Sequence, residues 1–440
     1  MRISRLLVHA ALGVLVLGVV LVGMTLWRFW IPSAAARQLA GMYAARPQVP
    51  DADNAYFYVW GLTAAADMDP LVEAGKRVAW LRRKSADPDL MEPDPGTELP
   101  SIGERRSDRM RQLAKSCGDG ASRACAAAFD AWPIEEPLSD IEVLQAARYA
   151  ELIKRPRWAE AVPFDATATL PPFAEVLDGQ RVELLQLRAA ATAGDGARVR
   201  QVLDRDFVFW REVQKSSYSL ITKMIACAAI RNHFFFGNLL LRELPPAQRT
   251  AAIPPSWRVP VSAEERGMFP VLSGEYEFAR VTLTRRLDPN ALDDDDDDED
   301  LTIDNWLLGW GDRLWPLQKD LNSIARVYVD TAESFEVPLD QYSRAARALE
   351  ARIPKSGRAS MNASHYAERV GALEGVRRAA LLTAELRGRG VPADQVASAL
   401  VAPAPGNPFT GAPFEWSTAQ QAVIFEGMEN HAWNRHVFFY

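Results

Sequence analysis

The chain has 440 residues, of which 48% are hydrophobic and 24% charged, which is typical of a globular protein and excludes a disordered or fibrous one. Its formal charge of −7 comes from one run, because residues 293–300 are all acidic and removing these eight negative charges leaves +1. Without an excess of basic residues, the chain is not expected to bind nucleic acid.

An apolar run opens the chain at residues 6–27. As a helix it is about 33 Å long, close to the ~30 Å hydrocarbon thickness of a bilayer. The alternative is a cleaved signal peptide with its cleavage site at residues 34–36. Such a peptide has a shorter apolar core, and Trp27 and Trp30 lie where interfacial aromatic residues are expected. We therefore predict a retained transmembrane anchor over residues 1–31.

The orientation of the anchor rests on its position in the chain. Arg2 and Arg5 precede the apolar run, while Arg28 and Arg37 follow it, so the charge bias is small. A signal anchor at this position favours an amino end inside the cell and about 410 residues outside it. We expect a single-pass protein of the bacterial inner membrane, mostly periplasmic, whose partners are the lipid bilayer and another envelope protein.

The next segments are predicted to form a linker and a helical body. Residues 32–50 are expected to be a linker with one helical stretch, and residues 51–405 a helical periplasmic domain. Within that domain, the acidic run is predicted to lie in a solvated loop over residues 289–304. A weaker alternative is an electrostatic docking site for a basic partner.

Two of the three cysteines are candidates for a disulfide. Cys117 and Cys125 flank a Gly-Asp-Gly turn, and pairing them in an oxidising compartment would stabilise the fold by roughly 2–3 kcal/mol. The alternative is two buried thiols on neighbouring helices. Cys227 is expected to be a packed, inert thiol. No metal site and no cofactor are predicted, because the cysteines lack a neighbouring histidine.

Two capping boxes predict helix starts, since in each a Ser and the Glu three residues later can bond each other's backbone amides. They pair Ser139 with Glu142 and Ser262 with Glu265, and Pro270 must break or kink the helix that begins at the second. Behind the first box, a helical spacing predicts one buried stripe, formed by Val143, Ala147, Ala150 and Ile153.

A helical hairpin is predicted in the middle of the chain. One helix should end at Ala193, and the next should start with Asp195 as its cap. Its expected apolar stripe consists of Val199, Leu203, Phe207, Trp210 and Val213. The junction LRAAATAGDGARVRQVL resembles the helix–turn–helix of tetratricopeptide-type repeats. The resemblance covers one hairpin, so it implies stacked antiparallel helices and not membership of that family.

The strongly apolar residues 220–241 are predicted to form a buried helix and not a second span. Lys223 and Arg231 lie within them, and each central charge would cost about 2.5–3.5 kcal/mol in a membrane. His233 on this helix is expected to be a core histidine that bonds a backbone carbonyl. A later helix should bury Tyr366, Val370, Leu373, Val376 and Ala380.

The amino-acid composition changes near the carboxyl end of the chain. Short segments rich in aromatic and β-branched residues at 414–416, 422–425 and 436–440 predict an antiparallel β meander within residues 406–440. Such a meander is only marginally stable alone, so it should pack on the helices. The fold class is therefore mainly α, with an amino-terminal membrane helix, helical hairpins and a small terminal β element.

No catalytic motif is present at the required spacing, and the catalytic residues are unknown. Trp306, Trp310 and Trp315 have helical spacing, which fits core packing or an interface hot spot. We expect a membrane-anchored, non-enzymatic interaction or scaffolding module. The alternative is an envelope hydrolase or transferase with a site assembled from scattered residues, for which a deep pocket lined by His233, His365 or paired carboxylates would be diagnostic.

Overall fold

The computed structural model describes most of the chain beyond the predicted anchor. The described ranges are 31–87, 90–95, 106–117, 122–162, 169–286, 317–353, 363–401, 406–428 and 434–440. The predicted membrane segment, the acidic run, and the aromatic residues Trp306, Trp310 and Trp315 lie outside these ranges.

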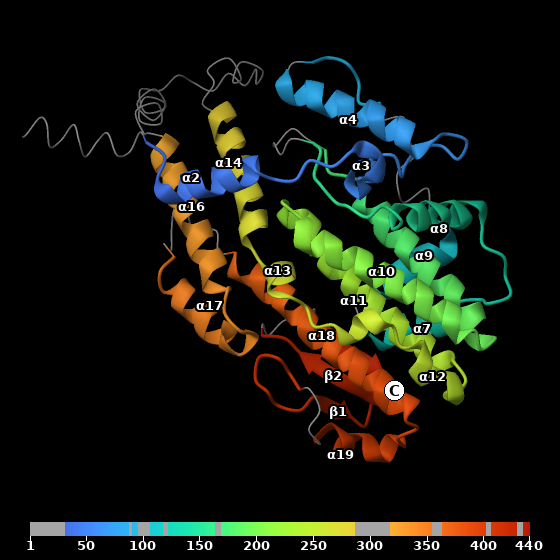
Figure 1. Cartoon of the computed structure of the whole chain (residues 1–440). Helices are drawn as coiled ribbons and strands as arrows, with labels where there is room; N and C mark the ends of the chain where they lie inside the picture. Colours follow the sequence, from blue (N-terminus) through green and yellow to red (C-terminus); the bar gives the residue numbers. More distant parts are fainter. Residues whose placement is uncertain are drawn as a thin grey trace, which may run out of the picture.

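The described chain is mainly α-helical and ends in a small antiparallel sheet (Figure 1), which confirms that part of the predicted fold class. The helices are α2 (Ala34–Ala44), α3 (Ala55–Val59), α4 (Pro70–Ala86), α6 (Asp108–Ser116), α7 (Arg123–Asp130), α8 (Asp140–Leu152), α9 (Phe173–Thr192), α10 (Gly196–Ser216), α11 (Leu220–Glu243), α12 (Pro246–Ala252), α13 (Ala263–Arg266), α14 (Phe269–Arg286), α16 (Leu317–Ser334), α17 (Tyr342–Glu350), α18 (Ser364–Gly388) and α19 (Val396–Val401). The 3-10 turn η2 (Pro255–Arg258) precedes α13, and the strands are β1 (Glu415–Ser417), β2 (Ala422–Glu426) and β3 (Arg435–Phe439).

Helix α11 lies at the centre of the molecule. Helices α8, α9, α11 and α18 are neighbours in that order, and α10 packs against α9 and α11. Among the described residues, α11 alone is long and apolar enough to cross a bilayer, yet 72% of its most apolar window is buried inside the protein. This burial is consistent with the predicted core helix.

A second group of helices joins the start of the described chain to its later part. Helix α2 packs against α14 and α16, with Ala36 and Leu39 buried, within the range predicted as a linker. The Ser33 amide donates to Asn322 Oδ1 at 2.7 Å, and Asn322 Nδ2 donates to the carbonyl oxygen of Ile31 at 2.9 Å. The chain is therefore held against α16 immediately after the predicted anchor.

The local signals for helix ends are confirmed. Both capping boxes form, with Glu142 Oε2 accepting from the Ser139 amide at 2.9 Å and Glu265 Oε2 from the Ser262 amide at 2.6 Å. Asp195 Oδ1 accepts from the Arg198 amide at 3.0 Å. All five residues of the stripe predicted for α10 are buried. Helix α18 likewise buries its predicted stripe, apart from the half-buried Tyr366.

The apolar stripe predicted for α8 is wrong at its first two positions, although Ile153 at its end is buried. Val143 is 53% exposed and Ala147 is exposed, while the buried face of α8 includes Glu142, Gln145 and Arg148. These polar side chains can be buried because distant segments supply their partners. The guanidinium of Arg109, for example, forms an ion pair with Glu142. Tertiary hydrogen bonds therefore decide which face of α8 points inward.

The terminal sheet has the predicted meander order β1-β2-β3, with Trp416 opposite Val423 and Val423 opposite Phe438. Helix α18 covers the sheet, and Gly375 of α18 allows the Phe425 ring of β2 to approach the helix backbone. A Cβ atom at position 375 would lie 2.1 Å from Phe425 Cζ.

The substitution Gly375→Ala is expected to lower the free energy of unfolding by about 1–3 kcal/mol, because the ring or the helix must move. Gly41→Ala is the matched control, since this exposed glycine of α2 has no atom within 4 Å of its would-be Cβ. The control should be neutral or stabilising by about 0.5–1 kcal/mol. Urea unfolding of both variants measures the difference, and equal effects would contradict the packing argument.

The start of α11 is held by a buried carboxyl group. Both oxygens of Glu160 accept from the Tyr218 amide at 3.2 Å, and Trp158 Nε1 donates to Glu160 Oε1 at 3.3 Å. Burial raises the pKa of Glu160 to about 7, against the lowering effect of these hydrogen bonds. The folded protein therefore favours the protonated form of Glu160 at pH values where the unfolded chain has lost the proton.

A pH series on Glu160→Gln tests this assignment. Because the pKa of Glu160 is raised in the folded protein, its protonated carboxyl group contributes fully to stability below about pH 4.5. This contribution is lost as the pH rises through about 7. Across that window the wild type should lose on the order of 3 kcal/mol relative to the variant. Denaturant unfolding at each pH gives the two curves. Parallel curves would show that Glu160 does not titrate in this way.

Candidate functional site

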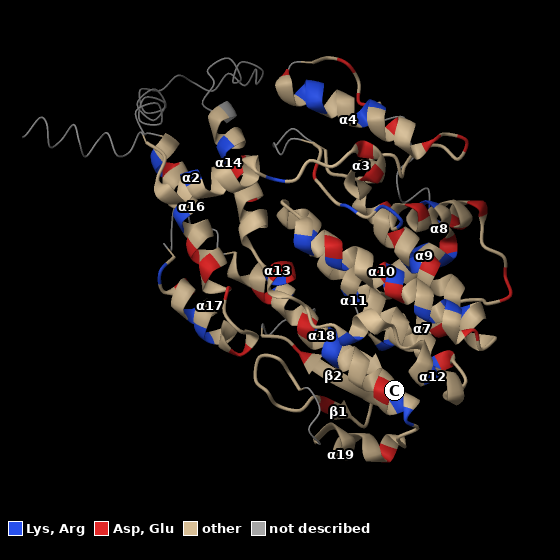
Figure 2. Ribbon diagram, viewed as in Figure 1, with Lys and Arg blue, Asp and Glu red and all other residues tan. Residues whose placement is uncertain are grey.

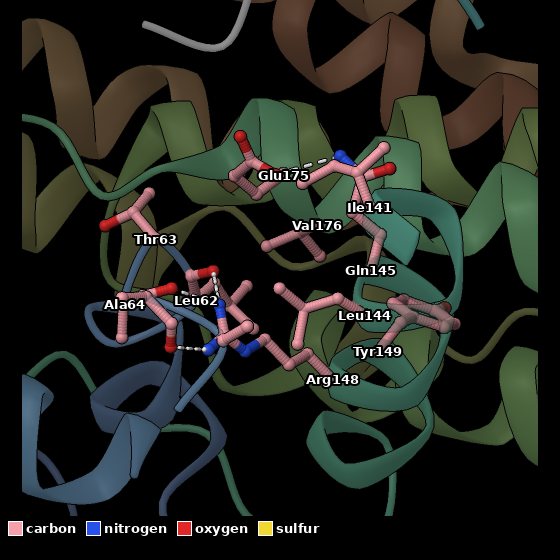
Figure 3. Close-up of a pocket in the computed structure, with 12 residues that line it drawn as sticks. Leu62, Thr63, Ala64, Ile141, Leu144, Gln145, Arg148, Tyr149, Glu175 and Val176 are labelled. Carbon is pink, nitrogen blue, oxygen red and sulfur yellow. Dashed lines mark hydrogen bonds between the residues drawn. The ribbon is translucent and has the colours of Figure 1, made fainter. Parts of the chain in front are cut away.

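A cavity of about 300 Å³ lies between the loop of residues 62–66 and helices α8 and α9 (Figure 3). We call it the Arg148 cavity. Its wall is mostly apolar, and the apolar side chains include Leu62, Ala64, Ile141, Leu144 and Val176. The polar residues of its lining are Thr63, Gln145, Arg148, Tyr149 and Glu175.

Arg148 holds the loop that forms one wall of the cavity. Its Nη1 donates to the carbonyl oxygens of Leu62 at 2.9 Å and Ala64 at 2.6 Å, and its Nη2 to that of Ala65 at 2.8 Å. The loop turns back sharply at Gly61, where a Cβ atom would lie 1.8 Å from the carbonyl oxygen of Pro70. A buried guanidinium thus satisfies backbone carbonyls that no secondary structure pairs.

The opposite wall carries a buried hydrogen-bond acceptor. Gln145 Nε2 donates to Glu175 Oε2 at 3.2 Å, as the dashed line in Figure 3 shows. This bond directs the amide nitrogen of Gln145 toward Glu175. Gln145 Oε1 is buried and has no hydrogen-bond partner among the described residues. Gln145 lines the cavity, and an unpaired acceptor beside the cavity is costly to bury.

Tyr149 joins the cavity to a buried polar network. It lines the cavity, its hydroxyl bonds Asp206, and it accepts from Trp210 Nε1 at 2.9 Å. Burial and the charge of Asp206 both raise the pKa of Tyr149, so its hydroxyl stays protonated. Tyr149 can therefore donate to Asp206, and this bond fixes the position of the cavity wall.

His233 is buried as expected, but its partners are side chains and not a backbone carbonyl. Its Nδ1 lies 2.7 Å from Asp206 Oδ2, and Trp257 Nε1 donates to its Nε2 at 2.7 Å. Because Nε2 accepts, the ring proton resides on Nδ1. Phe207 stacks on the ring at 5.3 Å, and the side chain is fully buried. The arrangement is that of a core histidine.

The other predicted site residues lie apart from the Arg148 cavity. Cys117 and Cys125 are joined by a disulfide bond between the end of α6 and α7. Cys227 is a buried free thiol, and burial raises its pKa. His365 is half-buried against Tyr366. In the described ranges, no group of three or more His, Cys, Asp or Glu residues is placed to hold a metal ion.

Sequence reasoning missed the cavity residues because they are polar. Glu142, Gln145 and Tyr149 follow helical spacing and share the buried face of α8 with Leu152. Their spacing of 3, 4 and 3 residues is a sequence signal for the buried face of a helix. A search for apolar residues alone does not detect it, because Glu142 and Gln145 are polar.

Comparison with protein-family models, with curated proteins and with solved structures finds no match for this chain.

Replacing Arg148 by Ala is expected to open the loop of residues 62–66. Carbonyl groups left without a partner cost about 1–3 kcal/mol each when they stay buried, so the loop should turn toward water. Hydrogen exchange in residues 61–69 should accelerate, and the unfolding midpoint should fall. Arg200→Ala, at an exposed position of α10, is the control and should change neither. An unchanged exchange rate in the Arg148 variant would show that Arg148 does not hold the loop of residues 62–66.

Proposed function

We propose that this chain is a single-pass, membrane-anchored protein of the bacterial envelope that binds another protein and acts as an interaction or scaffolding module. The Arg148 cavity is the contact site. The observation that carries this proposal is an apolar cavity of about 300 Å³ with a buried acceptor, Gln145 Oε1, that lacks a partner among the described residues.

The chemistry of the cavity defines the group that fits it. Its apolar walls favour a large apolar side chain, and Gln145 Oε1 favours one that carries a donor. Trp and Tyr combine an apolar ring with one N–H or O–H group, and they are enriched at the centres of protein interfaces. The partner therefore presents a Trp or Tyr side chain as its anchor.

Exposed apolar residues near the cavity support a protein as the occupant. Val143 and Met68, which are 53% and 45% exposed, each lie within two residues of a lining residue. A small molecule held in the cavity would leave such residues in water. A protein surface that inserts one anchor can cover them as well.

Several features support the proposed location. The apolar run of residues 6–27 has the length of a membrane span. The bond between Cys117 and Cys125 is typical of an oxidising compartment such as the periplasm. The hydrogen bonds of Asn322 to Ile31 and Ser33 hold the body at the end of the anchor, close to the bilayer surface.

The geometry favours binding over the hydrolase or transferase alternative. That alternative called for a pocket lined by His233, His365 or paired carboxylates. Neither His233 nor His365 lines the Arg148 cavity. Its acidic lining residue, Glu175, is paired with the side-chain amide of Gln145 and not with a second carboxylate.

Site-specific photo-crosslinking of the full-length protein in membranes tests the proposal. A crosslinking residue at position 144, on the cavity wall, should capture one partner protein. The same residue at position 401 is the control, because Val401 of α19 is 72% exposed and belongs to a separate part of the fold. It should capture none.

Leu144→Asp provides the second arm, because a charge in the apolar wall should weaken capture roughly tenfold, or about 1.4 kcal/mol. Val401→Asp should leave capture unchanged, and circular dichroism verifies that both variants fold. Equal capture by the two variants, or no partner at position 144, would overturn the proposal.

A further inference from the structure

The carboxyl-terminal half of α14 is exposed near the point where the described chain begins. Helix α14 packs against both α2 and α16. In Figure 1 its upper half extends past α2, on the side of the molecule away from the terminal sheet. This end of the fold is separate from the Arg148 cavity, which borders α8 and α9.

Side-chain contacts fix the level of α14 relative to the first described residue. Asn322 of α16 bonds Ile31, as described above, and its Oδ1 accepts from Gln318 Nε2 at 3.0 Å. The hydroxyl group of Tyr276, in the middle of α14, interacts with the side-chain amide of Gln318. Tyr276, the start of α16 and Ile31 therefore lie close together.

Helices α14 and α16 run antiparallel. Arg266, just before α14, donates from Nη1 to the hydroxyl of Tyr342, which follows α16, at 3.0 Å. Tyr276 in the middle of α14 is level with Gln318 in the first turn of α16. Helix α14 therefore continues past the start of α16, and its residues 277–286 project about 15 Å beyond Tyr276.

The projecting end of α14 combines apolar and basic residues. Phe278 is 36% exposed, and Val281 and Leu283 are half-buried. Residues 278–286 read FARVTLTRR, so this stretch of the sequence is basic and has no acidic residue. Arg280 is exposed and forms an ion pair with Glu277 at 2.7 Å. Apolar residues beside basic ones are typical of segments that lie in the interface of an anionic membrane.

The chain before residue 31 brings a bilayer within reach of this end. The apolar run ends at residue 27. Four residues span at most about 14 Å, so Ile31 lies within that distance of the end of the run. Helix α14 projects over a similar length from the level of Ile31. The distance from the proposed anchor therefore matches the reach of the helix.

We propose that residues 278–284 of α14 lie in the headgroup layer of the membrane, a contact that rests on the anchor proposed above. Phe278 and Val281 enter the boundary between headgroups and acyl chains, and Arg280 contacts anionic headgroups. The anchor by itself is a single point of attachment. A second contact through α14 limits how far the helical body can tilt against the bilayer.

Photo-crosslinking of the full-length protein in nanodiscs that contain phosphatidylglycerol tests the contact. Benzoylphenylalanine at position 278 keeps an aromatic side chain and should form lipid adducts, which mass spectrometry identifies. The same residue at position 401 is the control and should form none. Val401 is 72% exposed, but it belongs to α19, which lies far from α14 in Figure 1.

The crosslinker at position 17, within the apolar run, reports on the anchor separately. Lipid adducts at position 17 but none at 278, or equal adducts at 278 and 401, would overturn the α14 contact and leave the anchor standing. No lipid adduct at position 17 would contradict the anchor and, with it, this inference. A protein adduct at position 278 in place of lipid would assign the surface to a protein partner and overturn the proposal.

A charge variant tests the role of Arg280. In the protein with the crosslinker at position 278, Arg280→Gln should lower the lipid-adduct yield roughly fivefold, the factor expected for one basic residue at an anionic surface. Arg200→Gln, at an exposed position of α10, is the matched control and should keep the full yield. Equal yields in the two variants would contradict the contact between Arg280 and the headgroups.

Discussion

The helical stack depends on one buried carboxylate, that of Asp206 in α10. Its oxygens accept from Gln180 Nε2 at 3.1 Å and contact His233 Nδ1 at 2.7 Å, and they also bond the Tyr149 hydroxyl. These three partners belong to α9, α11 and α8, so four helices meet at one side chain. Removing one of these donors leaves the buried carboxylate short of a hydrogen bond, at a cost of about 1.5–3 kcal/mol. The helices can therefore rotate little against one another.

This constraint extends outward to the candidate site. Tyr149 must face Asp206, and one helical turn earlier on the same face of α8 lies Gln145, with Arg148 beside it. The rotation of α8 about its axis that brings the Tyr149 hydroxyl to Asp206 also directs Gln145 toward Glu175. It directs Arg148 toward the loop of residues 62–66. A buried polar network can in this way specify a surface feature, because side chains on one helix cannot turn independently of its axis.

Two cavities lie at different layers of the helical stack. The Arg148 cavity borders α8 and α9 and presents a buried acceptor in an apolar wall. A second cavity, of about 160 Å³, lies where α11, α18 and β3 meet, and its lining includes Arg231 and Arg369. Basic and acidic residues are interspersed along α10, whereas α4 is mostly basic (Figure 2).

The sequence by itself determined the features that depend on near neighbours: both capping boxes, the Asp195 cap, the apolar stripe of α10 and the order of the terminal strands. Each of these rests on hydrogen bonds or periodicity within a few residues, which a sequence displays directly. Only the tertiary structure decided the inward face of α8, the partner of His233 and both cavities. Tyr149 and Asp206 are 57 residues apart, and Arg148 bonds a carbonyl 86 residues before it. A polar residue is buried only when a distant group pairs with it, and no local pattern encodes that pairing.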